Sequence, residues 1–327
     1  MNKKRLRIVF MGTPAFAVES LRALVEGGYS VAGVVTMPDK PVGKHQSVLQ
    51  ASPVKQYALA QRLPILQPEK LKDPAFLAQL REWNADLQIV VAFRMLPEAV
   101  WNLPRLGTFN LHASLLPQYR GAAPIQWAII NGEKETGVTT FLLTHEIDTG
   151  AILFREKTPI ADTDNAENVH DRLMRLGAQL VLKTVDALAE NAVQPLPQSG
   201  LTTGEVLKPA PKIFKDTCRI DWNRPTGAVY NFIRGLAPAP GAWTELTPPQ
   251  GDLLHLKIFE AEPFLQAHCL PPGTIVSDGK KQFDVAADDG FIRVKTLQQA
   301  GKKRMAVEEF LRGRNFALVE NENTTLG

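Results

Sequence analysis

Short apolar runs alternate with segments of helical periodicity through the first two thirds of the chain, and this alternation limits the fold more than any other feature. Residues 87–93 (LQIVVAF) are nearly all apolar, which is typical of a strand covered on both faces. Ser52-Pro53 and Asp73-Pro74 each place proline after a side chain that caps helices, so each predicts a helix start. Further strands are predicted at 6–11, 30–36, 107–112 and 138–143. Further helices are predicted at 16–26 and 165–191, and Gly177 could interrupt the second of these helices. This order predicts an α/β domain with a doubly wound, mostly parallel sheet.

The chain changes character after about residue 190. The stretch 194–212 carries four prolines and little apolar periodicity, which is typical of a linker. Beyond it, short apolar runs separated by turn residues predict a small β-barrel or sandwich, and Arg304–Arg312 predicts a terminal helix. The strands are expected at 242–246, 254–259, 273–276, 283–286 and 291–296. We therefore expect an N-terminal domain of residues 1–190, a linker of 191–209 and a C-terminal domain of 210–327.

Composition and missing motifs exclude several classes of protein. The 327 residues include 37 Lys and Arg against 34 Asp and Glu, so the net charge of +3 argues against a strongly basic nucleic-acid protein, and any basic patch must be local. Cys218 and Cys269 lie far apart and the six histidines do not cluster, which predicts no bound metal. No glycine-rich dinucleotide motif or P-loop is present. No run approaches the roughly 18–20 apolar residues of a membrane span, so we expect no membrane association. The two widely separated cysteines fit a reducing cytoplasm best, so we expect a cytoplasmic location.

The densest chemical signal lies around residues 110–150. Asn110 and His112 alternate along a predicted strand, so both side chains should emerge on one face at the strand's end. Asp148 follows the next predicted strand in a turn, and polar side chains at neighbouring strand ends could form one site. A carboxamide can donate to a developing oxyanion, an imidazole can donate a proton, and a carboxylate can keep the imidazole charged. The set suits acyl-type transfer without a protein nucleophile.

The same residues also allow a structural explanation. A histidine after a strand is commonly a buried structural residue, and Asp148-Thr149-Gly150 could be an ordinary turn. His145 competes with His112 as the partner of Asp148, since it lies three residues away.

Longer motifs resemble a known family. Residues 110–139 (NLHASLLPQYRGAAPIQWAIINGEKETGVT), followed by Glu146-Ile147-Asp148-Thr149-Gly150, resemble the signature of the folate-dependent formyltransferase family. Supporting segments occur along nearly the whole chain, at 8–18 (IVFMGTPAFAV), 37–43 (MPDKPVG), 51–55 (ASPVK), 90–97 (VVAFRMLP), 219–225 (RIDWNRP), 233–243 (IRGLAPAPGAW) and 297–305 (LQQAGKKRM). The segment at 51–55 and the C-terminal segments at 219–225, 233–243 and 297–305 make the resemblance specific to the bacterial methionyl-tRNA formyltransferases.

The resemblance implies a fold, a reaction and a set of site residues. It implies a Rossmann-like catalytic domain followed by an OB-like barrel that helps to hold tRNA, in a monomer. It implies transfer of a formyl group from 10-formyltetrahydrofolate to the α-amine of methionyl initiator tRNA, for translation initiation, without a metal. By position, the catalytic residues are Asn110, His112 and Asp148. The folate-contacting loop matches Ser114, Leu115, Leu116 and Pro117.

Two segments are candidates for contact with tRNA. Residues 37–51 are too long for an ordinary connection between a strand and a helix, and long loops of this kind are usually functional. In the family this insert contacts the acceptor stem, and Lys44 stands where the family typically has Arg. In the C-terminal part, Lys302, Lys303 and Arg304 form a compact basic cluster on a predicted turn.

Three other functions stay open at this point. A formyltransferase acting on an amino-sugar nucleotide would share the first domain, whereas a folate-dependent hydrolase that releases formate would need the same triplet and no tRNA surface. A non-catalytic RNA-binding protein would use the barrel and the basic turn, with the sheet domain as a scaffold.

Overall fold

The structure, a computed structural model, describes residues 6–42, 48–201, 204, 206–248 and 252–312. The chain divides into two compact units. The first contains Met1–Pro124, Glu135–Pro159 and His170–Pro211, and the second contains Ile125–Lys134, Ile160–Val169 and Lys212–Gly327. Two short segments that precede His170 therefore belong to the C-terminal unit, so the boundary is not a single point in the sequence.

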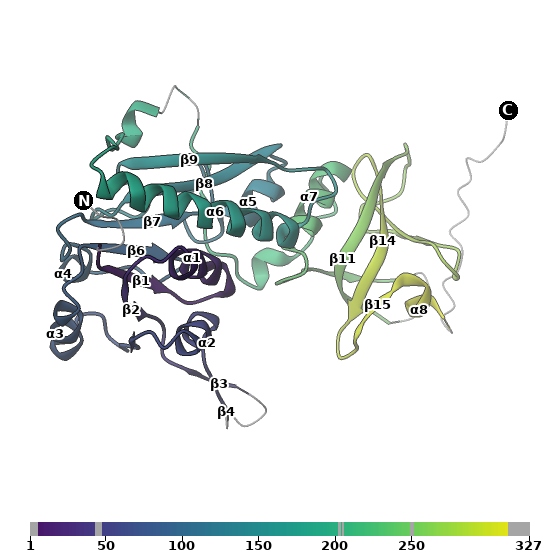
Figure 1. The fold of residues 1–327 in the computed structure, drawn as a ribbon. Helices are drawn as coiled ribbons and strands as arrows, with labels where there is room; N and C mark the ends of the chain where they lie inside the picture. Colours follow the sequence, from purple (N-terminus) through teal and green to yellow (C-terminus); the bar gives the residue numbers. More distant parts are fainter. Residues whose placement is uncertain (1–5, 43–47, 202–203, 205, 249–251, 313–327) are drawn as a thin grey trace. The chain divides into compact units, whose positions relative to one another are not determined.

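The first unit is built on a seven-stranded sheet in the order β5-β2-β1-β6-β7-β8-β9 (Figure 1). The strands are β1 (Ile8–Gly12), β2 (Val31–Val35), β5 (Ile65–Leu66), β6 (Leu87–Val91), β7 (Thr108–His112), β8 (Glu135–Leu142) and β9 (Ile152–Pro159). The first five in spatial order are parallel, whereas β8 and β9 run antiparallel to their neighbours. The predicted mostly parallel, doubly wound sheet is confirmed, and its order changes direction between β1 and β6.

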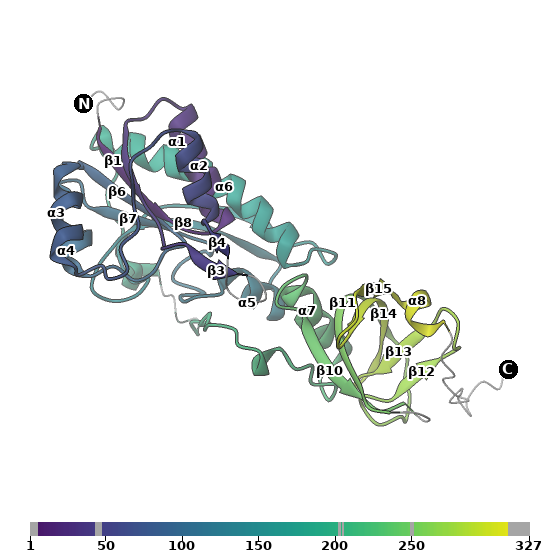
Figure 2. The same ribbon diagram turned by 90° about the horizontal axis from the view of Figure 1, so that it is seen from below.

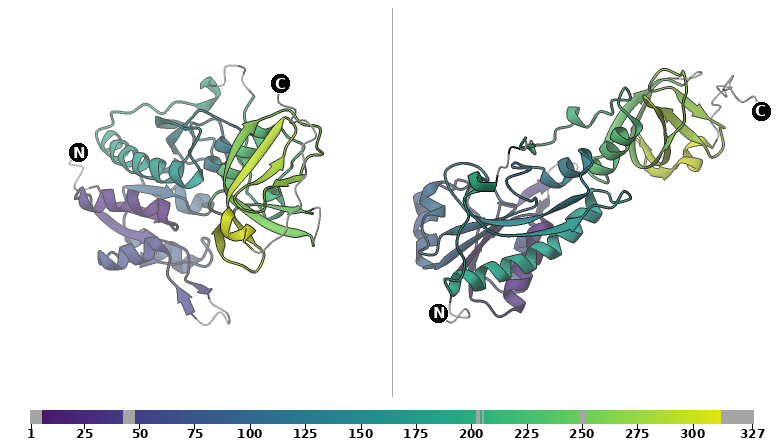
Figure 3. Two further views of the ribbon diagram at one scale, coloured as in Figure 1. Left: turned by 90° about the vertical axis from the view of Figure 1, so that its right-hand side faces the viewer. Right: turned by 90° about the horizontal axis from the view of Figure 1, so that it is seen from above.

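Helices cover both faces of this sheet. Figures 1 and 3 show α6 lying along one face, where Gly177 of α6 contacts Leu111 of β7, and Phe16 of α1 packs edge-on against His170 of α6. On the other face, Phe76 and Val100 from α3 and α4 join a core cluster with residues of β1, β2 and β6. The helices of this unit are α1 (Ala15–Glu26), α2 (Pro53–Ala60), α3 (Pro74–Glu82), α4 (Glu98–Trp101) and most of α6 (Ala166–Ala189), whereas α5 (Pro124–Ile130) belongs to the second unit from Ile125 onward.

The predicted helix starts after Ser52 and Asp73 are confirmed by capping contacts. The Ser52 hydroxyl accepts a hydrogen bond from the backbone N–H of Lys55 at 3.1 Å. The Asp73 carboxylate accepts one from the N–H of Ala75 at 2.8 Å. Each cap satisfies a backbone donor that the first helical turn leaves without a partner, and proline follows in the position that needs no donor.

Two local expectations differ from the structure, and one open alternative is decided by it. The helix expected at 165–191 is confirmed, and the break that Gly177 left open does not occur, because the glycine makes room for Leu111 rather than ending the helix. The insert of residues 37–51 is not an irregular loop throughout, because β3 (Lys40–Val42) and β4 (Val48–Gln50) pair as an antiparallel hairpin. The segment predicted as one terminal helix, Arg304–Arg312, begins as strand β15 (Arg304–Ala306) and becomes helical only in α8 (Val307–Leu311).

The second unit contains a curled, six-stranded antiparallel sheet (Figure 2). Its strands are β10 (Ala242–Leu246), β11 (Leu254–Leu265), β12 (Ile275–Ser277), β13 (Phe283–Ala286), β14 (Gly290–Gln299) and β15. Its core includes Ile258, Phe283, Ile292 and Leu297, and α7 (Thr226–Leu236) packs against β11 and β14. The barrel-like architecture is confirmed. Among the helices of the described ranges, none is long and apolar enough to cross a membrane.

Gly177 offers a test of the packing between α6 and the sheet. A Cβ atom at Gly177 would lie 2.6 Å from Leu111 Cδ2, so Gly177→Leu forces the helix away from the sheet. We expect the free energy of unfolding to fall by about 1–3 kcal/mol, the usual effect of overpacking. Gln179→Leu, at an exposed position on the same helix, should change it by less than about 0.5 kcal/mol. Equal effects in thermal or urea unfolding would contradict the packing argument.

Candidate active site

Asn110 and His112 share the face of β7 that looks away from α6. The strand's alternation points Leu111 toward Gly177 of α6. Asn110 is directly opposite Val90 of β6, and Val90 belongs to the core cluster on the other face. The prediction that Asn110 and His112 lie on one face is therefore confirmed.

The ring of His112 is buried, with a relative exposure of 6%, and both its nitrogens face acceptors. Nε2 lies 2.9 Å from the carbonyl oxygen of Tyr119, which can only accept, so Nε2 carries a proton. Nδ1 lies 3.9 Å from Oδ2 of Asp148. A doubly protonated ring would thus have an oxygen opposite each N–H.

Asp148 is held by the backbone around it. Its Oδ2 accepts a hydrogen bond of 3.0 Å from the N–H of Gly121, and its side chain is only 14% exposed. Its φ of 55° lies in the left-handed region. A residue other than glycine adopts this region at a cost in free energy, which the surrounding contacts must offset. Gly121 has φ 125°, a conformation open only to glycine, and a Cβ there would lie 2.4 Å from Ala210 O.

Asp148 does not arrive from a neighbouring strand end, as the sequence suggested. Because β8 is antiparallel to β7, Leu142 lies opposite Phe109, near the start of β7. The loop after β8 therefore leaves the sheet at the end remote from His112, and it folds back so that Asp148 reaches the histidine. The site lies over the face of β7 rather than along one edge of the sheet.

The competing histidine, His145, is not the partner of Asp148. Its side chain is 73% exposed, and its Nε2 lies 3.8 Å from Oε1 of Glu98. Its ring also packs edge-on against Trp101 of α4, with ring centres 5.3 Å apart.

The Asn110 carboxamide is half-buried, and none of the described hydrogen bonds uses it. Its two N–H donors are therefore available on the same face as His112. The site thus combines an unpaired carboxamide donor, an imidazole between two acceptors, and a carboxylate held by a backbone N–H.

Sequence reasoning missed Gln198, which lies in the proline-rich segment assigned as a linker. Gln198 is 3% exposed and begins a 3₁₀ turn, Gln198–Leu201. Its Nε2 donates to the carbonyl oxygens of Asp148 and Gly150, each at 2.9 Å. Its Oε1 accepts from Nε of Arg120 at 3.1 Å and from Nη2 at 2.6 Å. No local pattern marked this glutamine, because its partners are far away in sequence.

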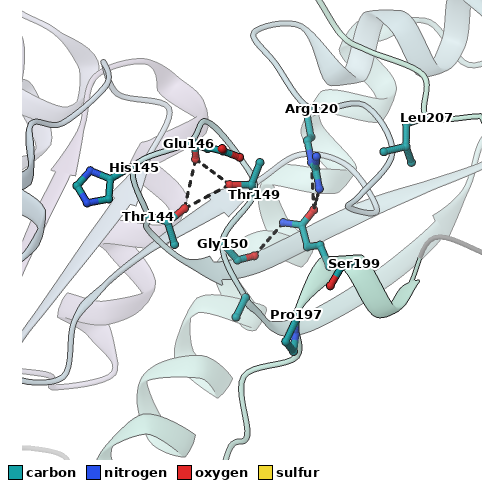
Figure 4. A pocket seen from close by; sticks show the side chains of 11 residues that line it. Arg120, Thr144, His145, Glu146, Thr149, Gly150, Pro197, Ser199 and Leu207 are labelled. Carbon is teal, nitrogen blue, oxygen red and sulfur yellow. Dashed lines mark hydrogen bonds between the residues drawn. The ribbon is translucent and has the colours of Figure 1, made fainter.

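A pocket of about 590 Å³ lies beside this network (Figure 4). Figure 4 shows Arg120, Pro197 and Ser199 on one side of the pocket, and Thr144, Glu146 and Thr149 on the other. The remaining lining residues are Gln198 itself, His145, Gly150, Ala151 and Leu207. The backbone on both sides of Asp148 therefore forms part of the wall of a space large enough for a small molecule.

The predicted folate loop is largely internal. Ser114 is fully buried and donates to Gln118 O at 2.7 Å, and Leu116 and Pro117 are also buried. Leu115 is the member of the four that stays half-buried, so a ligand could reach its side chain most readily.

The residues assigned to tRNA lie in different places. Lys44 lies outside the described residues. Lys302 and Lys303 are exposed on the turn after β14, as expected. Arg304 opens β15, where Nη2 lies 3.1 Å from Oε1 of Glu260 and the guanidinium lies 4.4 Å from the Phe259 ring centre. No group of three or more His, Cys, Asp or Glu side chains within the described ranges could hold a metal ion.

Comparison with solved structures supports the fold. HypX from Aquifex aeolicus, solved in complex with tetrahydrofolic acid, superposes with a TM-score of 0.62 at 18% identity over 96% of this chain, which spans 49% of HypX. WlaRD, a sugar 3N-formyl transferase, gives a TM-score of 0.62 at 19% identity and covers 91% of this chain and 99% of its own. At these identities the likeness concerns the fold alone.

Sequence comparison is more specific. Residues 6–185 match the Formyl transferase family and residues 212–315 match the Formyl transferase C-terminal domain, so both units are covered. The methionyl-tRNA formyltransferase of Bacteroides thetaiotaomicron is 65% identical over 313 residues, which is 96% of this chain and 97% of that protein. The chain therefore belongs to the formyl transferase family, among the methionyl-tRNA formyltransferases.

Proposed function

We propose that the chain transfers the formyl group of 10-formyltetrahydrofolate to the α-amine of methionine carried by initiator tRNA. The observation that carries this proposal is the 65% identity to a methionyl-tRNA formyltransferase across 96% of the chain, through both units. The site geometry supports an acyl-type transfer, because it offers hydrogen-bond donors and a carboxylate on one face of β7. A monomeric state in solution and a cytoplasmic location remain part of the same proposal.

In the proposed reaction, Asn110 and His112 stabilise the developing negative charge. The neutral amine attacks the formyl carbon, a C–N bond forms, and the electron pair moves to the former carbonyl oxygen. Asn110 Nδ2–H donates a hydrogen bond to this oxygen. Nδ1–H of a protonated His112 donates a second, because Nε2–H is engaged with Tyr119 O whereas Nδ1, at 3.9 Å from Asp148 Oδ2, is too far away for a hydrogen bond to the carboxylate. The electron pair on oxygen then re-forms the C=O bond as the bond to N10 of the folate breaks. N10 takes up one proton, and the attacking amine loses one.

Asp148 has two tasks in this mechanism. Its Oδ2, 3.9 Å from Nδ1 of His112, stabilises the charged imidazole ring, and it helps to remove the proton that the amine loses on forming the new bond. Since an α-amine has a reference pKa of about 7.7–8, part of it is neutral near pH 7 without a strong base. The residues Ser114, Leu115, Leu116 and Pro117 form the folate loop in this proposal, with Leu115 as the side chain open to a ligand.

A row of side chains on the second unit suits a tRNA surface. Trp243 of β10 is opposite Lys257 of β11, Lys257 is opposite Gln298 of β14, and Gln298 is opposite Arg304 of β15. Residues directly opposite in register share a face, so these four side chains form one line across the sheet. The exposed Arg219 lies over the Trp243 ring, with its Cζ 5.5 Å from the ring centre. Cations interleaved with an aromatic ring are typical of nucleic-acid surfaces. Lys302 and Lys303 add two more cations to this row of side chains. In the first unit, Lys44 is proposed to contact the acceptor stem.

The choice of acceptor decides between the two transferase functions. Offered 10-formyltetrahydrofolate with either methionyl initiator tRNA or an amino-sugar nucleotide, the protein should formylate the tRNA-bound amine. Formylation of the sugar alone would contradict the proposal, and release of formate without any acceptor would indicate a hydrolase. Binding of RNA without formyl transfer would indicate a non-catalytic protein.

The catalytic triplet predicts large losses of turnover. Asn110→Ala and His112→Ala each remove a donor to the oxyanion, so each should lower kcat by about 10²–10³-fold. Asp148→Ala should also lower kcat strongly. Gln179→Ala, which alters an exposed side chain of α6 on the opposite face of the sheet, serves as the control and should leave kcat within about twofold. Near-normal turnover in all three triplet variants, at saturating tRNA, would overturn the assignment.

The basic turn predicts a change in tRNA affinity rather than in chemistry. The double variant Lys302→Ala/Lys303→Ala should raise the KM for tRNA with little change in kcat. It should also reduce the slope of log affinity against log salt concentration by about one for each phosphate that the protein no longer neutralises. Lys280→Ala/Lys281→Ala removes the same charge from the exposed turn between β12 and β13 and is the control. Identical effects of the two double variants would mean that only net charge matters.

A further inference from the structure

Gln198 joins the two segments that hold the Asp148 carboxylate. Its carboxamide nitrogen donates to Asp148 O and Gly150 O, which fixes the peptide units that follow Asp148 and Gly150. Its carboxamide oxygen accepts from the guanidinium of Arg120. Arg120 directly precedes Gly121, whose N–H donates to the Asp148 side chain. One buried side chain thus contacts both the backbone that carries the carboxylate and the residue beside the donor that orients it.

The chemistry of these contacts calls for a carboxamide. Two carbonyl oxygens require two N–H donors, and a guanidinium requires an acceptor, so the orientation of the amide group is determined by its partners. A glutamate could still accept from Arg120, but it would place oxygen against the two carbonyl oxygens. A shorter asparagine would not span the same distance. Because the side chain is 3% exposed, water cannot easily take the place of the carboxamide as a hydrogen-bond partner.

The four hydrogen bonds of Gln198, which we call the clamp, matter because of the backbone conformation of Asp148. A non-glycine residue with φ 55° is held in an uncommon backbone region by its surroundings, and Gln198 bonds the carbonyl of that residue itself. If the clamp is released, the loop can relax toward a commoner backbone conformation, and Oδ2 then moves away from Gly121 N and His112 Nδ1. Small displacements of a reacting group can lower rates by about 10²-fold.

We propose that Gln198 is a positioning residue for the transfer reaction, acting through Asp148 rather than on a substrate. The proposal rests on the function proposed above, in which Asp148 takes part in catalysis. It gives the irregular last segment of the first unit, which ends at Pro211, a direct part in the geometry of the reaction.

Two substitutions separate positioning from folding. Gln198→Leu removes all four hydrogen bonds, and Gln198→Glu keeps the acceptor for Arg120 but removes both donors. Each should lower kcat by about 10–100-fold, while KM for folate and for tRNA changes by less than about threefold and the protein stays folded at the assay temperature. Gln88→Leu is the matched control, because Gln88 is also a buried glutamine, 1% exposed, and its Oε1 accepts from Thr108 at the end of β7 remote from His112. It should leave kcat within about twofold.

A double-mutant cycle with Asp148→Asn provides the decisive measurement. If Gln198 acts only through the carboxylate, Gln198→Glu should lower kcat no further in the Asp148→Asn background. Multiplying losses would show an independent or purely structural effect and would overturn the proposal, as would unchanged kcat in both Gln198 variants. If Asp148→Asn by itself left kcat unchanged, the proposed function of the triplet would fail instead, so the two failures are distinguishable.

Discussion

The reversal of chain direction at β8 is the constraint on which the rest of the site depends. β8 runs antiparallel to β7, so the loop that follows it starts beside Phe109, far along β7 from His112. Asp148 reaches His112 only because this loop folds back over the sheet, where the backbone of Asp148 takes a φ of 55°. A carboxylate delivered in this way needs partners that hold it, and Gly121 N–H and the Gln198 carboxamide supply them.

The segment that leads toward the second unit is part of the structure around the site. Tyr119 accepts from His112 through its carbonyl oxygen, and its own N–H donates to Lys208 O at 2.7 Å. Ala210 N–H donates to Arg120 O at 2.8 Å, and Ala123 N–H donates to Ala210 O. Residues 206–210 therefore lie along the loop that orients both His112 and Asp148. The proline-rich composition of this segment indicates that it lacks regular structure, but it does not indicate which residues the segment contacts.

Much of the fold could be predicted from local patterns. The Ser-Pro and Asp-Pro starts of α2 and α3 depend on contacts within a few residues, as do strands such as β13, whose predicted range of 283–286 equals the observed one. Predictions failed where distant residues decide the outcome. Gly177 reads as a helix breaker, yet it lies inside a 24-residue helix because Leu111 occupies the space beside it. The sequence pattern also did not indicate β9, α7 or the β3–β4 hairpin, since strand pairing and packing against the second core stabilise these elements.

The sequence by itself determined the two architectures, the family and the pair Asn110 and His112 on one strand face, because alternation along a strand and the motif around it are local properties. Only the tertiary structure decided which histidine faces Asp148, since His145 is nearer in sequence but points to Glu98. It alone also brought Gln198 to the carbonyl of Asp148, fifty residues away along the chain. Contacts of this kind arise from the antiparallel turn after β8 and from the pairing of Leu196 with Ile152 and of Ala210 with Gly121, and no short-range pattern encodes them.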